Sequence, residues 1–193
     1  LDALDRINVA DDTLVIFSSD NGPARGSPNT KLTLSYDSAT GPGFGVGAAK
    51  GITGGRRAFK GALMEGGIGV PFIARWPGKV PAGKVDKTSI LSAVDLLPTF
   101  CELAGVKLPS GYKTDGISQV LALMGKGSEL RKKPLFWRMS APWPAPKDRP
   151  DHWVAYAVVH EQWKLAVNND LSHVELFDLV QDPLERKNIS QEY

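Results

Sequence analysis

The sequence lacks the features that would tie it to a membrane, to nucleic acid or to a disulfide framework. Its single cysteine, Cys101, cannot form a disulfide within the chain. No apolar stretch approaches the roughly 18 residues that cross a bilayer. The formal net charge of +2 is too small for the clustered positive charge that binds nucleic acid or anionic lipid. We therefore expect neither partner, and a globular chain of ordinary composition, with 42% hydrophobic and 23% charged residues.

The beginning of the sequence has neither an initiator methionine nor a capping residue for its first helix. Apolar residues at Leu1, Leu4 and Ile7 recur at helical spacing, and nothing precedes them. We expect from this that the chain is part of a longer one. A signal or transit peptide would then lie outside it, so the sequence itself leaves localisation open.

Two apolar runs predict an α/β arrangement in the first part of the chain. Residues 13–18 form a continuous, β-branched run, which is typical of a buried strand in a parallel or mixed sheet. A second strand is expected at 70–76, where Pro71 is tolerated because it stands near the strand start. The segment between them, 23–59, is rich in Gly, Pro, Ser and Thr, and irregular segments of this length are often functional.

The pattern of the sequence changes near residue 125. Before it, apolar spacing predicts helices over 89–104 and 117–124. After it come short strand candidates separated by turns, as in antiparallel sheets, at 133–138, 153–159, 163–167 and 174–179. We therefore divide the chain into an α/β portion, residues 1–125, and a small antiparallel-sheet portion, residues 126–193.

A short polar motif stands where α/β sheets bind ligands. Asp20 and Asn21 follow the run at 13–18, and the carboxyl ends of strands are the usual ligand-binding edge. A carboxylate beside an amide oxygen suits a hard cation such as calcium or magnesium, although Asn-Gly is equally a favoured turn dipeptide. Calcium takes about six to eight oxygens, so the two residues alone cannot complete a site.

Charged side chains gather around the end of the irregular segment. Lys60 could act as a point charge for an anionic group, and Gly61 would let the backbone approach a ligand; a solvated surface lysine is the simpler interpretation. Arg56 and Arg57 could contact an anionic substrate or be solvated loop charges. Glu65 could orient Lys60 or a backbone amide, or could belong to a plain turn.

Several blocks together resemble the sulfatase family, and their order and spacing extend over nearly the whole chain. Residues 13–22 resemble the family's metal-binding strand, and residues 60–71, followed by 75–78, resemble its second conserved block. The remaining blocks are 94–100, 115–116, 163–165 and 175–179 with Asp182, Pro183 and Glu185.

The resemblance implies an alkaline-phosphatase-like α/β fold, with part of a mixed sheet, flanking helices and a small antiparallel carboxy-terminal sheet domain. It also implies hydrolysis of sulfate esters, carbohydrate sulfates among them, at a site with one bound calcium, with magnesium as the alternative. Asp20 and Asn21 would be metal ligands, and Lys60 would hold a sulfate oxygen and stabilise charge on the transferring sulfuryl group. The family favours an extracytoplasmic location.

The chain departs from the family in what it lacks. The family's nucleophile is a cysteine or serine oxidised to formylglycine in a Cys-x-Pro-x-Arg or similar motif, whereas Cys101 is followed by Glu102 and Leu103. Formylglycine, the family's paired aspartates and its two active-site histidines would all lie upstream of Leu1. Gly69 stands where an arginine is common in the family.

The sequence therefore predicts the carboxy-terminal portion of a calcium-dependent sulfatase, a sulfuric ester hydrolase that is inactive as an isolated chain. Its partner would be the missing amino-terminal half or a second copy of itself, because the strand at 13–18 would otherwise have unpaired edges. Two alternatives remain open. One is a phosphodiesterase or phosphonate monoester hydrolase of the same fold; the other is a non-catalytic module that binds sulfated glycans through Lys60, Arg56, Arg57 and exposed tryptophans.

Overall fold

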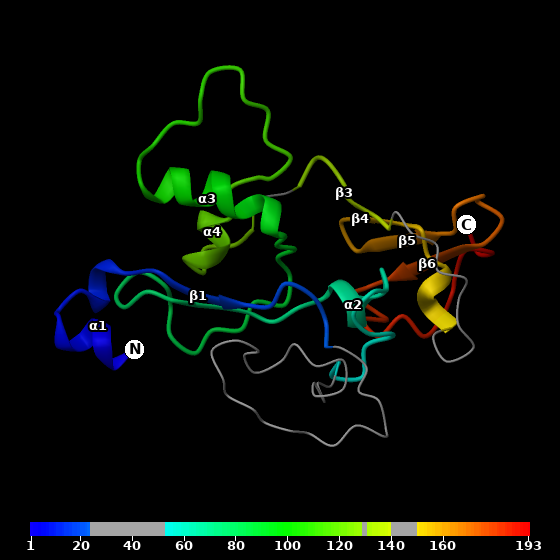
Figure 1. Ribbon diagram of the computed structural model, residues 1–193, viewed down its shortest axis with the longest axis horizontal. Coiled ribbons are helices and arrows are strands. Elements are labelled where there is room, and N and C mark those ends of the chain that lie inside the picture. Colours follow the sequence, from blue (N-terminus) through cyan, green and yellow to red (C-terminus); the bar gives the residue numbers. More distant parts are fainter. Residues whose placement is uncertain (24–52, 129–130, 140–149) are drawn as a thin grey trace, which may run out of the picture. The chain divides into compact units, whose positions relative to one another are not determined.

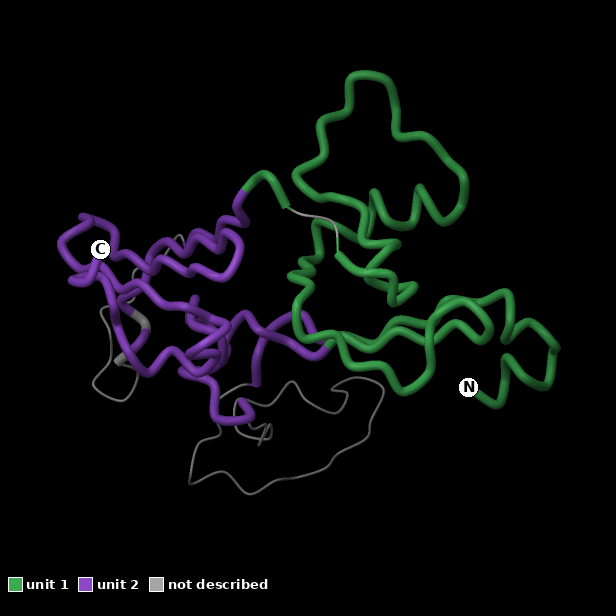
Figure 2. Tube along the Cα trace, turned by 180° about the vertical axis from the view of Figure 1, so that it is seen from behind, with its two compact units in different colours: residues 1–18, 72–133 green, residues 19–71, 134–193 purple. Residues whose placement is uncertain are grey.

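The computed structural model describes residues 1–23, 53–128, 131–139 and 150–193, which are arranged in two compact units (Figure 1). Unit 1 consists of residues 1–18 and 72–133, and unit 2 of residues 19–71 and 134–193 (Figure 2). Unit 2 thus groups the described residues 19–23 and 53–71 with the carboxy-terminal sheet, and the predicted division at residue 125 stays a prediction. Most of the predicted irregular segment at 23–59 lies outside the described residues.

Unit 1 contains the two strands expected in the first part of the chain. After the helices α1 (Asp2–Arg6) and η1 (Ala10–Asp12), β1 (Val15–Ser18) pairs with β2 (Phe72–Arg75). The ladder is antiparallel and places Val15 opposite Arg75 and Ser18 opposite Phe72. Pro71 immediately precedes β2, where no ladder hydrogen bond is required of it.

The prediction that the first strand is buried was wrong for the described residues. Phe17 on β1 is 62% exposed and Ile73 on β2 is 60% exposed. Within the described ranges β1 pairs only with β2, so the ladder there is antiparallel and not parallel. An apolar run shows that both faces of a strand can be covered, whereas its actual burial depends on which other elements lie against it.

The helical part of unit 1 is held by a buried carboxylate. The helix predicted over 89–104 begins later, as η2 (Ala93–Asp95) and α3 (Leu96–Leu103), because Ser92 and Asp95 form a capping box. Asp95 is fully buried, accepts a hydrogen bond from the Ile117 backbone N–H at 2.9 Å, and pairs with Arg131. The second predicted helix is present as the short α4 (Val120–Leu123).

Unit 2 contains the antiparallel sheet predicted for the carboxy-terminal part of the chain. The strands run in the order β3-β4-β5-β6 and are preceded by α2 (Glu65–Ile68), with η3 (Pro150–Trp153) before β4. Their bounds are β3 Leu135–Arg138, β4 Tyr156–His160, β5 Trp163–Val167 and β6 Val174–Asp178. All four predicted strands are therefore confirmed, with their ends displaced by up to three residues.

The core of unit 2 joins the sheet to the segment just before α2. Ala157, Ala166 and Phe177 lie on one face of the sheet and pack with Leu63 and Met64. Met64 and Phe177 are completely buried. The segment that carries Lys60 is thus anchored to the sheet three residues further along the chain. None of the helices in the described ranges is long and apolar enough to cross a membrane.

Candidate active site

The turn that follows β1 carries the two predicted metal ligands. Asn21 donates a hydrogen bond from Nδ2 to the Gly22 carbonyl at 3.0 Å, which leaves Oδ1 as the side-chain atom for a cation. Asp20 is exposed, and none of the described residues donates a hydrogen bond to its carboxylate. The Ser19 hydroxyl donates to the Asn21 carbonyl at 2.9 Å and tightens the turn. The turn therefore carries two hard oxygen donors on consecutive residues.

The same turn lies against the segment that carries Lys60. The Gly22 N–H donates to the Gly67 carbonyl at 2.8 Å, and the Lys60 N–H donates to the Pro23 carbonyl at 3.0 Å. Gly22 is required there, because a Cβ at this position would lie 1.8 Å from the Gly66 carbonyl oxygen. Two backbone hydrogen bonds thus bring together the three residues that the sequence predicted separately as site residues, Asp20, Asn21 and Lys60.

Lys60 is exposed, and its backbone lies next to this turn. No described residue forms an ion pair with it. The chain reverses at Gly61, whose φ of 87° lies in the region that only glycine adopts readily. The positive charge of Lys60 is therefore available to an anionic group.

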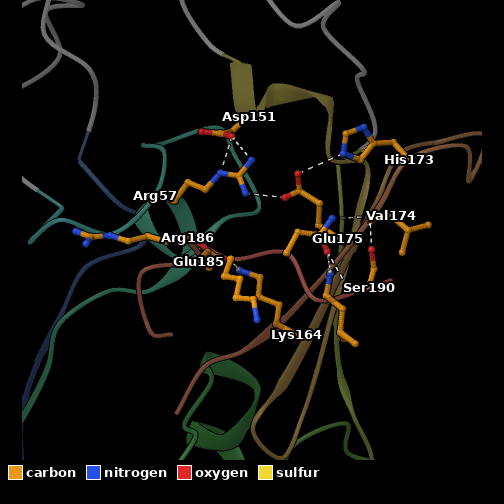
Figure 3. Close-up of polar contacts among 12 residues, drawn as sticks. Arg57, Asp151, Lys164, His173, Val174, Glu175, Glu185, Arg186 and Ser190 are labelled. Carbon is orange, nitrogen blue, oxygen red and sulfur yellow. Dashed lines mark hydrogen bonds and ion pairs between the residues drawn. The ribbon is translucent and has the colours of Figure 1, made fainter. Parts of the chain in front are cut away.

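Arg57 has two carboxylate partners within unit 2 (Figure 3). Its Nε donates to Asp151 Oδ1 at 2.7 Å, and its Nη1 donates to Glu175 Oε2 at 2.6 Å. Burial lowers the pKa of the Arg57 guanidinium, but hydrogen bonds with Glu175 and Asp151 outweigh burial, so the pKa is raised. Arg57 is therefore not a solvated loop charge. The predicted contact with an anionic substrate stays a prediction, which would require the guanidinium to give up these partners.

Arg56 lies close to Gly69. Its Nη1 donates to the Gly69 carbonyl at 2.9 Å. A Cβ at Gly69 would lie 2.6 Å from Glu65 Oε2 and 3.1 Å from Arg56 Nη1. The glycine therefore makes room chiefly for Glu65, and the Arg56 guanidinium lies close beside it. The contact of Arg56 with substrate also stays a prediction.

The residue that sequence reasoning missed is Lys164. Its Nζ donates to Glu65 Oε1 at 2.9 Å and lies 2.7 Å from Glu185 Oε1 in an ion pair, and the side chain is fully buried. Glu65 therefore does not orient Lys60 directly, since the described partner of its carboxylate is Lys164. The sequence carried one signal of this arrangement, because Lys164 and Glu185 both lie in the blocks that resemble the family.

Comparison with known proteins assigns this arrangement to a family. Residues 1–106 match the family described as sulfatase, and residues 56–193 match the one described as N-sulphoglucosamine sulphohydrolase, C-terminal. The chain belongs to the sulfatase family. The recognition made from the sequence blocks is confirmed, including the restriction to the carboxy-terminal part.

Known sulfatases and related hydrolases that resemble this chain are longer than it is. The sulfatase chain is 38% identical to arylsulfatase G of Mus musculus over 126 residues, covering 65% of this chain and 22% of that protein. It also resembles a solved protein in complex with its substrate, D-glucosamine-2-N,6-O-disulfate (TM-score 0.64, 24% identity, 100% of this chain and 33% of that one). Phosphonate monoester hydrolase of Agrobacterium radiobacter is similarly related (TM-score 0.58, 25% identity, 99% of this chain and 33% of that one). The predicted alkaline-phosphatase-like α/β fold is confirmed, and the chain spans a third or less of each protein.

The described residues fit part of a metal site. The Asp20 carboxylate and the Asn21 amide oxygen are the hard donors that calcium and magnesium prefer. In the described ranges no group of three or more His, Cys, Asp or Glu side chains could hold a metal ion. The remaining oxygens would therefore come from outside the described residues.

We expect Arg57→Met in the full-length protein to lower the free energy of unfolding by about 2 kcal/mol, a few degrees in the unfolding midpoint. The reason is that Asp151 and Glu175, which are 16% and 12% exposed at their side chains, lose their cation. Thermal unfolding measures the effect, and Arg186→Met at an exposed position serves as the control. A variant with unchanged unfolding but weakened binding of a sulfate ester would show that Arg57 contacts substrate instead.

Proposed function

We propose that this chain is the carboxy-terminal portion of a sulfatase that hydrolyses sulfate esters at a site containing one calcium ion, with magnesium as the alternative. The proposal depends chiefly on one observation: two backbone hydrogen bonds join the Asp20–Asn21 turn to the Lys60 segment. A pair of hard oxygen donors can hold a metal cation, and Lys60 has no ion-pair partner among the described residues. A metal cation and an ammonium group together can bind the charged oxygens of a sulfate ester. Membership of the sulfatase family supports the same reaction.

Each residue has a defined task in this proposal. Asp20 and Asn21 would hold the cation, which would polarise the sulfate oxygens when bound. Lys60 would contact a sulfate oxygen, and its interaction would strengthen as negative charge develops in the transition state. Because its ammonium has no carboxylate partner among the described residues, it need not break an existing ion pair to do so.

We propose a sulfated carbohydrate as the substrate class. Residues 56–193 match a family described as N-sulphoglucosamine sulphohydrolase, C-terminal, and one structural neighbour binds a disulfated glucosamine. The similarity to phosphonate monoester hydrolase keeps a second candidate activity under test, because its fold and coverage are comparable.

Replacing Lys60 tests the proposal directly. In the full-length protein, Lys60→Ala should lower kcat/KM for a sulfate ester by about 10²–10³-fold, the usual loss when one donor to a developing anion is removed. Lys107→Ala, at an exposed position of unit 1, should leave kcat/KM unchanged. Full activity of Lys60→Ala would contradict the proposal. Preferential hydrolysis of a phosphonate monoester by the unmodified protein would favour the second activity.

Metal removal tests the role of the turn. Dialysis of the full-length protein against a chelator should abolish hydrolysis, and added calcium or magnesium should restore it. Asp20→Ala should raise the cation concentration for half-maximal activity by about tenfold or more, since a charged ligand is lost. Asp115→Ala, another exposed carboxylate, should behave like the unmodified protein. Activity that survives chelation would exclude a cation-dependent site.

The isolated chain of 193 residues should show no turnover. It should also self-associate, because Phe17 and Ile73 leave apolar side chains exposed on the β1–β2 ladder. Activity assays and light scattering test both expectations. Hydrolysis by this chain that disappears with Lys60→Ala would refute the first, and a monomer that melts cooperatively would refute the second.

A further inference from the structure

A fully buried ammonium stands in the middle of the sheet of unit 2. Lys164 lies on β5 opposite Val159 of β4 and Phe177 of β6, on the face that faces the core. Its side chain is 0% exposed. A lysine is almost never buried to this extent unless carboxylates accompany it. Two do so here, Glu65 and Glu185. Lys164 and Glu185 are labelled in Figure 3.

The two carboxylates connect the sheet to α2. Glu65 is the first residue of α2, and its Oε1 accepts a hydrogen bond from Lys164 Nζ at 2.9 Å. Glu185 pairs with Lys164 through Oε1 at 2.7 Å, and its Oε2 accepts the Glu65 backbone N–H at 2.6 Å. Burial raises the pKa of Glu185, and the charge of Lys164 opposes that rise. The backbone at Glu65 is thus fixed through both its side chain and its amide.

This fixed point lies five residues beyond Lys60 and directly before the contact with the metal-ligand turn. Within α2 the Gly66 N–H donates to the Arg57 carbonyl at 2.7 Å. The Gly67 carbonyl accepts the Gly22 N–H at 2.8 Å, and Gly22 follows Asn21. A displacement at Glu65 would therefore be transmitted to the turn that carries the metal ligands and to the Lys60 segment.

Stability alone does not explain a charge at this position. Apolar side chains in place of all three groups could fill the same space without the cost of desolvating charges, and such replacements of a whole ion cluster are often neutral or stabilising. What an apolar residue cannot do is hold the Glu65 carboxylate and, through Glu185, the Glu65 amide in one orientation. The ion cluster therefore supplies geometry more than stability.

We propose that Lys164, together with Glu185, is a positioning residue of the active site, which fixes α2 so that Lys60 and the Asp20–Asn21 turn stand in the geometry for catalysis. This inference rests on the proposed function. It gives the carboxy-terminal sheet a part in turnover through the positioning of other residues.

The test compares kcat and KM for a sulfate ester in the full-length protein. Lys164→Met should lower kcat by about 10–100-fold and change KM less than about twofold, because small displacements of catalytic groups cost about this much in rate. Lys187→Met is the matched control, since that lysine also pairs with a glutamate, Glu192 at 2.8 Å, but is 70% exposed. An unchanged kcat in Lys164→Met would overturn the inference.

A mutant cycle separates positioning from general damage. In a Lys60→Ala background, adding Lys164→Met should lower kcat by a smaller factor than it does in the unmodified protein, because one of the two groups being positioned is already absent. An undiminished loss in that background would show that Lys164 acts independently of Lys60 and would overturn the inference. If Lys60→Ala itself left kcat/KM unchanged, the proposed function would fail first, so the two failures are distinguishable.

A second variant covers the case in which Lys164→Met does not fold. Glu185→Gln keeps an oxygen that can accept the Glu65 N–H but removes the charge that pairs with Lys164. We expect a smaller loss in kcat, about 3–10-fold, again with KM nearly constant. Wild-type kcat in a folded Glu185→Gln protein would also overturn the inference.

Discussion

The candidate site depends on the hydrogen bond that the Gly22 N–H donates to the Gly67 carbonyl. A Cβ at Gly22 would lie 1.8 Å from the Gly66 carbonyl oxygen, so only glycine permits this approach. Without it, the backbone hydrogen bond between Lys60 and Pro23 would be the one left, among the described residues, between the turn with Asp20 and Asn21 and the segment with Lys60. The Asn-Gly dipeptide, which by sequence was equally a plain turn, is thus both a turn and the contact on which the site is built.

Local patterns in the sequence predicted the positions of the strands better than they predicted the burial of the strands. The run at 163–167 matches β5 at both ends, because alternating apolar residues and flanking turns fix a short strand. The run at 13–18 gave β1 but not its exposure, since burial depends on neighbours that the run does not encode. The late start of α3 followed from the capping box of Ser92 and Asp95, a signal that the apolar spacing alone overlooked.

The site residues divide in the same way. Asp20, Asn21 and Lys60 could be nominated because each stands in a short motif with a recognisable chemistry. Lys164 could not be identified in this way. In Trp163–Lys164–Leu165 the strand alternation puts the lysine on the other face from two large apolar residues, and this pattern predicts a lysine that faces solvent. The burial of Lys164 is possible because Glu65 and Glu185, from other segments of the chain, form ion pairs with it. No local sequence pattern predicts these contacts.

The carboxy-terminal sheet belongs to the same compact unit as the candidate site, so it is more than an appended domain. Asp20, Asn21, Lys60 and Lys164 all belong to unit 2, whereas a division at residue 125 would separate Lys164 from the others. Leu63 and Met64 pack on Phe177, and Glu65 is bound by Lys164, so consecutive residues after Lys60 are fixed to the sheet by apolar and by charged contacts. Apolar packing restrains the distance of this segment from the sheet, and the ion cluster restrains its orientation. Both restraints are needed where the rate of a reaction depends on the placement of one ammonium group.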